Sequence, residues 1–263
     1  MIEFIKEIVK LFLPPIFFKY RRVFNGIYDD FNDIPNLTSY DSTESLDNIY
    51  NETVKKLRSC KSRKMLPDAH PRSQILNLLP LIISLQKNKR EVSVLDYGGG
   101  MGTSYIDCIS SIDVSNVKYY VYDLKEKMDL GKEIFSQDSN IRFVNNIEGI
   151  EDIDIIYLGS VLQYINNYEK LLKEVFGKSP KYIFLTDNFM GNIRYATAQT
   201  NMKGRRMAYW IFELKEIIQL FGAHDFNLIY KSVNYQPLIH FNNFPEQYRV
   251  VDSCNLLFSR ETG

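Results

Sequence analysis

Residues 91–105 read EVSVLDYGGGMGTSY, and this stretch decides the fold. It opens with β-forming apolar residues that predict a short buried strand over 92–96. Thr103 and Ser104 then suit the start of a helix, and the turn between strand and helix is made of Gly98, Gly99, Gly100 and Gly102. A buried strand that runs through glycines into a helix N-terminus is typical of a nucleotide-binding site, because a ligand can lie against bare main chain.

Strand and helix patterns alternate on the carboxyl side of this turn. Each expected strand ends in a polar residue, and strand–helix–strand units at this spacing predict a parallel sheet with helices on both faces. Ligands in such sheets bind beyond the carboxyl ends of the strands. We expect strands at 92–96, 117–122, 141–144, 153–158, 182–186, 226–233 and 255–259, with helices at 104–111, 125–135, 168–176 and 210–220.

The chain is expected to divide into an N-terminal extension, 1–70, and an α/β domain, 71–263. The extension has an amphipathic start, an irregular aromatic segment and a helix at 42–57; another helix is expected over 71–85. We expect the amphipathic start to pack on its own domain or on a second copy in a homodimer; lying on a membrane surface is the alternative. Two insertions, 187–207 and 234–250, lack clear periodicity and are expected to be loops near the site.

Bulk composition excludes several classes of function. Lys+Arg 32 balances Asp+Glu 32 over 263 residues, which argues against a nucleic-acid partner. The cysteines Cys60, Cys108 and Cys254 are far apart and form no pair motif, so we expect neither a disulfide framework nor a metal site. Free thiols favour a cytoplasmic location.

The spacing of the glycines bears on which nucleotide binds. Thr103 stands where a dinucleotide-binding turn needs its third glycine. S-adenosylmethionine has no pyrophosphate and carries a cationic amino group, which suits Asp96 at the end of the first strand. Asp123, at the end of the second strand, suits the ribose hydroxyls, and Asn146, after the third, suits adenine. We therefore expect S-adenosylmethionine, with a NAD-dependent oxidoreductase as a less favoured alternative.

Several segments carry a family resemblance: LDYGGGMGTSY (95–105), LGSVLQYINN (158–167), CNLLFSR (254–260), FNGIYDDF (24–31) and the region 209–230. On these residues the chain resembles class I methyltransferases, and more closely a family of methyltransferases from bacterial capsule and O-antigen gene clusters. The resemblance implies a Rossmann-like, seven-stranded, mostly parallel sheet whose last strand is antiparallel. It also implies S-adenosylmethionine as cofactor and S-adenosylhomocysteine as product. Relatives often have Glu-Gln at the end of the second strand, where this chain has Asp123 and Leu124.

Site residues follow from the strand ends and the resemblance together. The expected cofactor-binding residues are Asp96, Gly98, Gly100, Gly102, Tyr105, Asp123, Leu124, Asn146 and Ser160. A protonated acceptor needs a base, for which His240 is the first candidate and Asp187 the second. Tyr164 is expected to orient the acceptor. The expected acceptor-binding residues are Gln163, Asn188, Arg194, Arg205 and Arg206, the arginines because a guanidinium binds phosphate as a fork; a solvated basic loop is the alternative reading of those arginines.

These observations predict a cytoplasmic S-adenosylmethionine-dependent methyltransferase. Its expected acceptor is a small polar molecule, phosphorylated or nucleotide-activated, on the way to a surface polysaccharide, with oxygen methylation favoured by that context. The alternative from a different class is a non-catalytic, methyltransferase-like subunit that binds a partner protein through its N-terminal helix.

Overall fold

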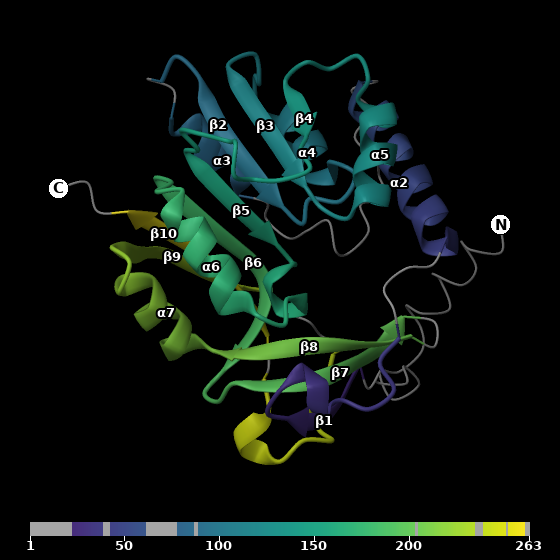
Figure 1. Ribbon diagram of the computed structural model, residues 1–263, viewed down its shortest axis with the longest axis vertical. Helices are drawn as coiled ribbons and strands as arrows, with labels where there is room; N and C mark the ends of the chain where they lie inside the picture. Colours follow the sequence, from purple (N-terminus) through teal and green to yellow (C-terminus); the bar gives the residue numbers. More distant parts are fainter. Residues whose placement is uncertain are drawn as a thin grey trace, which may run out of the picture.

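The computed structural model describes residues 23–38, 43–61, 78–86, 89–202, 205–234, 239–250 and 252–260. The amphipathic segment expected at the N-terminus and the first part of the helix expected over 71–85 lie outside these residues. Figure 1 shows a main sheet between two layers of helices, with a smaller group of strands across one end of it.

The main sheet has the order β4-β3-β2-β5-β6-β10-β9. Its strands are parallel except β10, which is antiparallel to both neighbours, β6 and β9. The expected seven-stranded arrangement with an antiparallel last strand is therefore confirmed. The strands are β2 Val92–Tyr97, β3 Val117–Tyr122, β4 Ile141–Phe143, β5 Ile155–Gly159, β6 Tyr182–Gly191, β9 Phe226–Asn234 and β10 Ser253–Arg260.

Alternating side chains build a separate core on each face of this sheet. Val94 of β2 packs with the helices α2, α3 and α4, whereas the next residue, Leu95, packs with α6 and α7 on the other face. Both faces are covered, which explains why β2 is apolar at almost every position. The helices are α2 Thr43–Lys61, α3 Leu79–Ser84, α4 Thr103–Ser111, α5 Lys125–Ile134, α6 Tyr168–Gly177 and α7 Leu214–Gly222.

A second group of strands, the accessory sheet, consists of β1 Phe24–Tyr28, β7 Tyr195–Met202 and β8 Arg205–Glu213. β8 joins the far end of β6 in parallel, β7 pairs with β8, and β1 pairs with β7. In Figure 1 the β7–β8 hairpin crosses below the main sheet, beyond the carboxyl ends of its parallel strands. Two expectations were therefore wrong: 187–207 is mostly strand, not loop, and the helix expected from Trp210 begins only at Leu214.

The described parts of the N-terminal extension contact the α/β domain and the accessory sheet. The segment expected to be irregular contains β1, a strand of the accessory sheet, and the short 3-10 helix η2 Phe31–Asp33. Helix α2 packs on α4 and α5, where Lys56 reaches the carbonyl of Thr103 at 3.3 Å. The second insertion adds the 3-10 helix η5 Glu246–Tyr248 and packs Phe241 and Phe244 against the accessory sheet.

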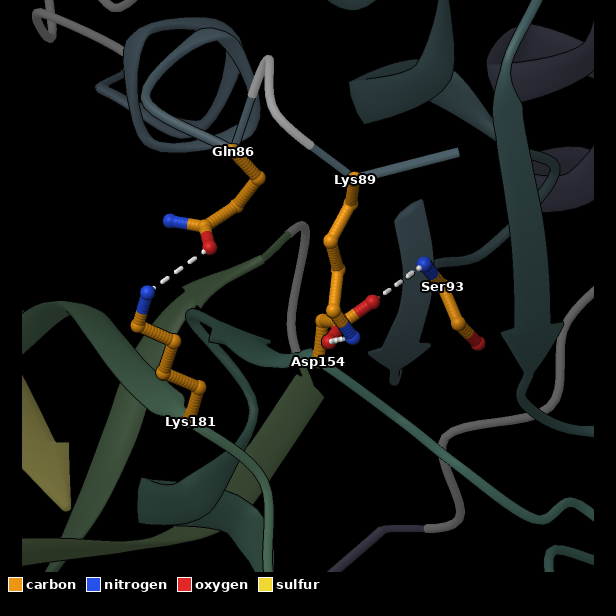
Figure 2. A network of polar contacts seen from close by, with 5 residues as sticks. All are labelled: Gln86, Lys89, Ser93, Asp154 and Lys181. Carbon is orange, nitrogen blue, oxygen red and sulfur yellow. Dashed lines mark hydrogen bonds and ion pairs between the residues drawn. The ribbon is translucent and has the colours of Figure 1, made fainter. Parts of the chain in front are cut away.

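A network of polar contacts closes the amino-terminal edge of the main sheet (Figure 2). Asp154 accepts a hydrogen bond from the Ser93 backbone N–H at 3.0 Å and pairs with Lys89, and Lys181 donates to Gln86 at 3.0 Å. The backbone of Asp154 also bonds to β2 and β6. These contacts join the starts of three strands to the chain that enters β2.

Within the described ranges, no helix is both long enough and apolar enough to cross a membrane.

Candidate active site at the carboxyl ends of the strands

The glycine turn after β2 is packed on most sides and open at one position. A Cβ on Gly98 would lie 2.4 Å from a Val161 methyl carbon, and one on Gly102 would lie 2.9 Å from Ile141. A Cβ on Gly100 would meet nothing within 4 Å. Gly100 has φ +61°, a backbone conformation that favours glycine. This position is where a ligand can lie against the main chain.

Asp96 supports the turn from inside. Its side chain is 1% exposed and accepts a hydrogen bond from the Tyr119 hydroxyl at 2.8 Å. A Cβ on Gly99 would lie 2.5 Å from its carboxyl carbon, so only glycine fits there. Burial raises the pKa of Asp96 to about 7, against the opposing effect of the Tyr119 hydrogen bond. Direct contact between Asp96 and the amino group of S-adenosylmethionine stays a prediction, because the glycine turn encloses the Asp96 carboxyl group.

Asp123 links the end of β3 to the turn. Its Oδ2 accepts the Gly100 backbone N–H at 2.8 Å, and its Oδ1 accepts the Leu124 backbone N–H at 2.6 Å. Lys127, one turn into α5, forms an ion pair with Oδ1 at 2.9 Å, and both side chains are largely buried. A carboxylate has about four acceptor positions, so these contacts leave room on Oδ2 for a ribose hydroxyl. Lys127 was not among the expected site residues, and its i,i+4 spacing from Asp123 is the signal that would have identified it.

The remaining expected cofactor residues divide into two groups. Leu124 and Asn146 are exposed after β3 and β4, at the same edge as Asp123. Tyr105 is not at the site: it is fully buried in the core below α4, and its hydroxyl donates to Asp138 at 3.0 Å. Tyr105 lies in the first turn of α4, on the face of the helix that packs on the core, so the expectation that it binds the cofactor was wrong.

Ser160 and Asp187 face each other just beyond the last paired residues of β5 and β6, Gly159 and Thr186; the strand expected to end at Thr186 continues through Asp187 to Gly191. Their backbones are both left-handed, with φ +54° and +58°, and Ser160 Oγ lies 3.5 Å from Asp187 Oδ2. Gln163 donates to Ser160 Oγ at 2.9 Å. Non-glycine residues in this conformation are uncommon and concentrate at functional sites. Because Val161 touches Gly98, this pair of strand ends adjoins the glycine turn.

Tyr164 connects these strand ends to the accessory sheet. Its hydroxyl donates to Gln199 of β7 at 2.9 Å, and its ring packs edge-on against Tyr209 of β8. Burial raises the pKa of Tyr209 well above its ordinary value, and the neighbouring Tyr164 and Asp187 raise that pKa further. Tyr209 was missed because this part of the chain was expected to be a loop and a helix.

The expected arginine cluster does not form one site. Arg194 stands before β7, paired with Glu216 at 3.2 Å and above the Trp210 ring. Arg205 and Arg206 begin β8 at the opposite end of the hairpin, roughly 25 Å away at about 3.3 Å per residue. Arg206 lies near the Tyr28 hydroxyl at 3.4 Å. A single phosphate therefore cannot bind all of these arginines, and a role for any of them in acceptor binding stays a prediction.

Two other expected residues have different surroundings. Asn188 is fully buried, and its side chain donates to the Thr186 carbonyl, so its role in binding an acceptor stays a prediction. His240 lies in the second insertion beside Phe241, which packs on Phe189 just after Asp187. A role for His240 as the base stays a prediction.

Two cavities lie along the accessory sheet, away from the glycine turn. One of ≈ 330 Å³ is lined by Asn25, Thr200 and Asn243, and one of ≈ 270 Å³ by Asp30, Arg194 and Trp210. Neither borders Asp123 or Asp187, so we locate the site from the strand ends, where ligands bind in parallel sheets. The described residues hold no cluster of His, Cys, Asp or Glu suited to a metal ion.

Comparisons with known proteins identify the fold. No family model matches the chain, and no curated protein matches it. Among solved structures, 1,6-didemethyltoxoflavin-N1-methyltransferase from Burkholderia thailandensis is 14% identical with a TM-score of 0.52, over 86% of this chain and 93% of that chain. That structure contains bound 1,6-didemethyltoxoflavin and S-adenosylhomocysteine.

Two further structures show the range of proteins with this fold. Magnesium protoporphyrin IX methyltransferase from Synechocystis PCC 6803, with bound S-adenosylhomocysteine, is 13% identical with a TM-score of 0.51, over 84% of this chain and 100% of that chain. A pericyclic reaction enzyme is 12% identical with a TM-score of 0.51, over 85% of this chain and 56% of that chain. At these identities the likeness concerns the fold, and the chemistry depends on the site residues. The chain has the mixed α/β, Rossmann-like fold of S-adenosylmethionine-dependent methyltransferases.

Proposed function

We propose that this protein transfers a methyl group from S-adenosylmethionine to a small polar acceptor. The observation that carries this proposal is the contact between Gly100 and Asp123. It joins the one open position of the glycine turn to the acid at the end of β3, so main chain and carboxylate present a single surface. The solved structures of this fold that hold S-adenosylhomocysteine support the same ligand.

The residues present fit this cofactor. Asp123 can accept a ribose hydroxyl through Oδ2, and the bare Gly100 peptide lets the ligand approach closely. The exposed Asn146 is available to an adenine edge. When bound, S-adenosylmethionine supplies a methyl group attached to a sulfonium.

The chain itself supplies alignment and a proton acceptor. Methyl transfer is an in-line displacement, so holding the acceptor in line accounts for much of the rate gain. We assign Asp187, which lies next to Ser160 and is separated from the glycine turn by β5, as the group that takes the proton of an acceptor hydroxyl or amine. His240 is the alternative base.

The resemblance to methyltransferases of capsule and O-antigen clusters supports a finer proposal. The acceptor is then a sugar precursor of a surface polysaccharide, methylated on oxygen in the cytoplasm. A phosphorylated or nucleotide-activated form of that precursor depends on Arg205 and Arg206 alone, because Arg194 is engaged by Glu216.

Titration calorimetry tests the donor. We expect S-adenosylhomocysteine and S-adenosylmethionine to bind and NAD not to bind. Gly100→Asn should weaken S-adenosylhomocysteine binding at least about tenfold, since asparagine keeps the left-handed backbone and places a side chain where the ligand lies. Gly177→Asn is the matched control, because Gly177 also faces open space but is the last residue of α6, outside the loops that follow β2, β3 and β4. Wild-type affinity in Gly100→Asn, or tighter binding of NAD, would contradict the proposal.

A further inference from the structure

Asp187 is held by two side chains of the neighbouring strand β10. Ser253 Oγ donates to Asp187 Oδ1 at 2.7 Å, and the Asp187 backbone N–H donates to Asn255 Oδ1 at 3.0 Å. Ser253 is 0% exposed and Asn255 is 2% exposed. Burying polar side chains in a sheet is costly unless they are bonded, so these two residues stabilise one particular placement of Asp187.

A β-bulge explains how both side chains reach the same residue. In the β6–β10 pairing, Cys254 is opposite Asn188 but Leu256 is opposite Leu185, so β6 has an extra residue facing Asn255. Asp187 occupies this bulge with its φ of +58°. Bulges bend a strand and redirect a side chain, and they recur beside active sites.

The contacts continue across neighbouring strand ends and form what we call the strand-end row. Toward β9, Asn255 donates to Ser232 Oγ at 3.1 Å. Toward β5, Ser160 lies beside Asp187 and accepts a hydrogen bond from Gln163, whose buried Oε1 has no hydrogen-bond partner among the described residues. The row consists of Ser232, Asn255, Ser253, Asp187, Ser160 and Gln163.

The charge of the strand-end row selects the kind of group it can bind. Asp187 is its one ionisable acid, and every other member is a neutral amide or hydroxyl. The arginines lie elsewhere: Arg194 is with Glu216, and Arg205 and Arg206 begin β8, roughly 10–13 Å along the strand from Tyr209 at about 3.3 Å per residue. Asp187 acts electrostatically on Tyr209 of β8. An anionic group at the row would meet a carboxylate with no compensating cation in the row, which is unfavourable.

We propose that the strand-end row binds the reacting group of the acceptor, and that this group is a hydroxyl or amine on a neutral or cationic part of the molecule. Ser253 and Asn255 are positioning residues for Asp187. This inference rests on the proposed function. In the reaction, the acceptor lone pair forms the bond to the methyl carbon, the carbon–sulfur bond breaks with its electron pair on sulfur, and the acceptor proton passes to Asp187.

Three hexose probes test the inference: glucose, glucosamine and glucose 6-phosphate share a ring and differ in charge. Each is titrated, by ligand-observed NMR, against the protein saturated with S-adenosylhomocysteine. We expect glucosamine to bind best and glucose 6-phosphate worst. The measured quantity is the affinity for glucosamine divided by the affinity for glucose 6-phosphate. Asp187→Asn removes the charge and should reduce this ratio at least about tenfold. Ser253→Ala only misplaces the charge and should reduce the ratio about threefold.

The ratio separates positioning from general damage, since a poorly folded variant loses affinity for all probes alike. Asparagine is tolerated at positive φ, so Asp187→Asn should keep the bulge. Ser259→Ala, at the far end of β10, is the control and should leave the ratio unchanged. The inference is overturned if glucose 6-phosphate binds best, if Asp187→Asn keeps the wild-type ratio, or if neither glucose nor glucosamine binds. If S-adenosylhomocysteine itself does not bind, the proposed function fails, and the same ratios measured on the protein alone still decide the inference.

Discussion

The two edges of the main sheet each place an aspartate at a strand end, and they hold it differently. At the amino-terminal edge, Asp154 is 5% exposed and bonds to the backbone of the adjacent strand (Figure 2). At the carboxyl edge, Asp187 is half-buried in a left-handed bulge; its carboxylate accepts a hydrogen bond from the Ser253 side chain, and its backbone N–H donates to the Asn255 side chain. A carboxylate that is bonded to backbone holds neighbouring strands together, whereas one that is bonded to a side chain is held in a particular orientation. We therefore expect stability to depend on the amino-terminal edge and chemistry on the carboxyl edge.

The largest effect is expected at the carboxyl edge, from Asp123→Ala. We expect about 100-fold weaker binding of S-adenosylhomocysteine, because hydrogen bonds to a charged group are worth roughly 1.5–3 kcal/mol. Calorimetry measures this directly. Lys127→Met, which removes only the neighbour of Asp123, is the control and should cost tenfold or less, by roughly the same scale. An Asp123→Ala protein that binds within threefold of wild type, at about 0.7 kcal/mol, would break the assignment of this edge to the donor.

Asp96 should make stability depend on pH. Burial raises its pKa to about 7 in the folded state, above the value of 3.8 for an unperturbed carboxyl. The folded state therefore binds the proton more tightly, and the free energy of unfolding rises as pH falls from above 7 toward 5. The gain is on the order of 2–3 kcal/mol. Denaturant unfolding of wild type and Asp96→Asn at pH 5 and pH 8 measures it, and identical pH slopes for the two proteins would refute it.

At the amino-terminal edge, Asp154→Asn should lower the free energy of unfolding by about 2 kcal/mol. The substitution replaces a buried carboxylate that accepts from the Ser93 backbone N–H and from the Lys89 ammonium. The melting temperature should fall by roughly 4–8 °C. Lys89→Met is the matched control and should cost under about 1 kcal/mol, since Lys89 is 51% exposed. S-adenosylhomocysteine affinity should not change, and a loss of affinity would show that the two edges are not independent.

The smallest effect concerns the link from the strand ends to the accessory sheet. Tyr164→Phe removes one neutral hydrogen bond to Gln199, so we expect a loss of stability of about 1 kcal/mol. A double-mutant cycle with Gln199→Leu should recover a coupling energy of about the same size. Additive effects of the two substitutions would show that this hydrogen bond does not couple the segment after β5, which contains Tyr164, to the β7–β8 hairpin.

The main sheet could be predicted because its signals are local. Each strand is a short apolar run, each ends at a polar residue, and the glycine turn fixes the direction of the chain. Asp123 was identified from its place at a strand end alone. Such signals depend on residues near one another in sequence.

The accessory sheet could not be predicted in the same way. β7 is largely small and polar, and only Glu213 separates the apolar residues of β8 from Leu214 of α7, so the sequence does not mark the boundary clearly. Ser253 and Asn255 stood next to or within the segment that carried the resemblance. Their contact with Asp187 arises from pairing between strands 66 and 68 residues apart. Tyr105 was misplaced because proximity to the glycine turn was given more weight than the core face of the helix.

The position of β1 has a consequence for how the protein is made. Thr197 of β7 bonds to Gly26 of β1 across 171 residues, and Asn243 bonds to Phe24 across 219. During synthesis, the strands around the glycine turn can assemble from sequence neighbours as they leave the ribosome. β1 leaves first but has no partner strand until β7 follows. Bringing such distant segments together carries an entropy cost that slows folding. The surroundings of Tyr164 are therefore expected to be completed last, after the donor half has formed.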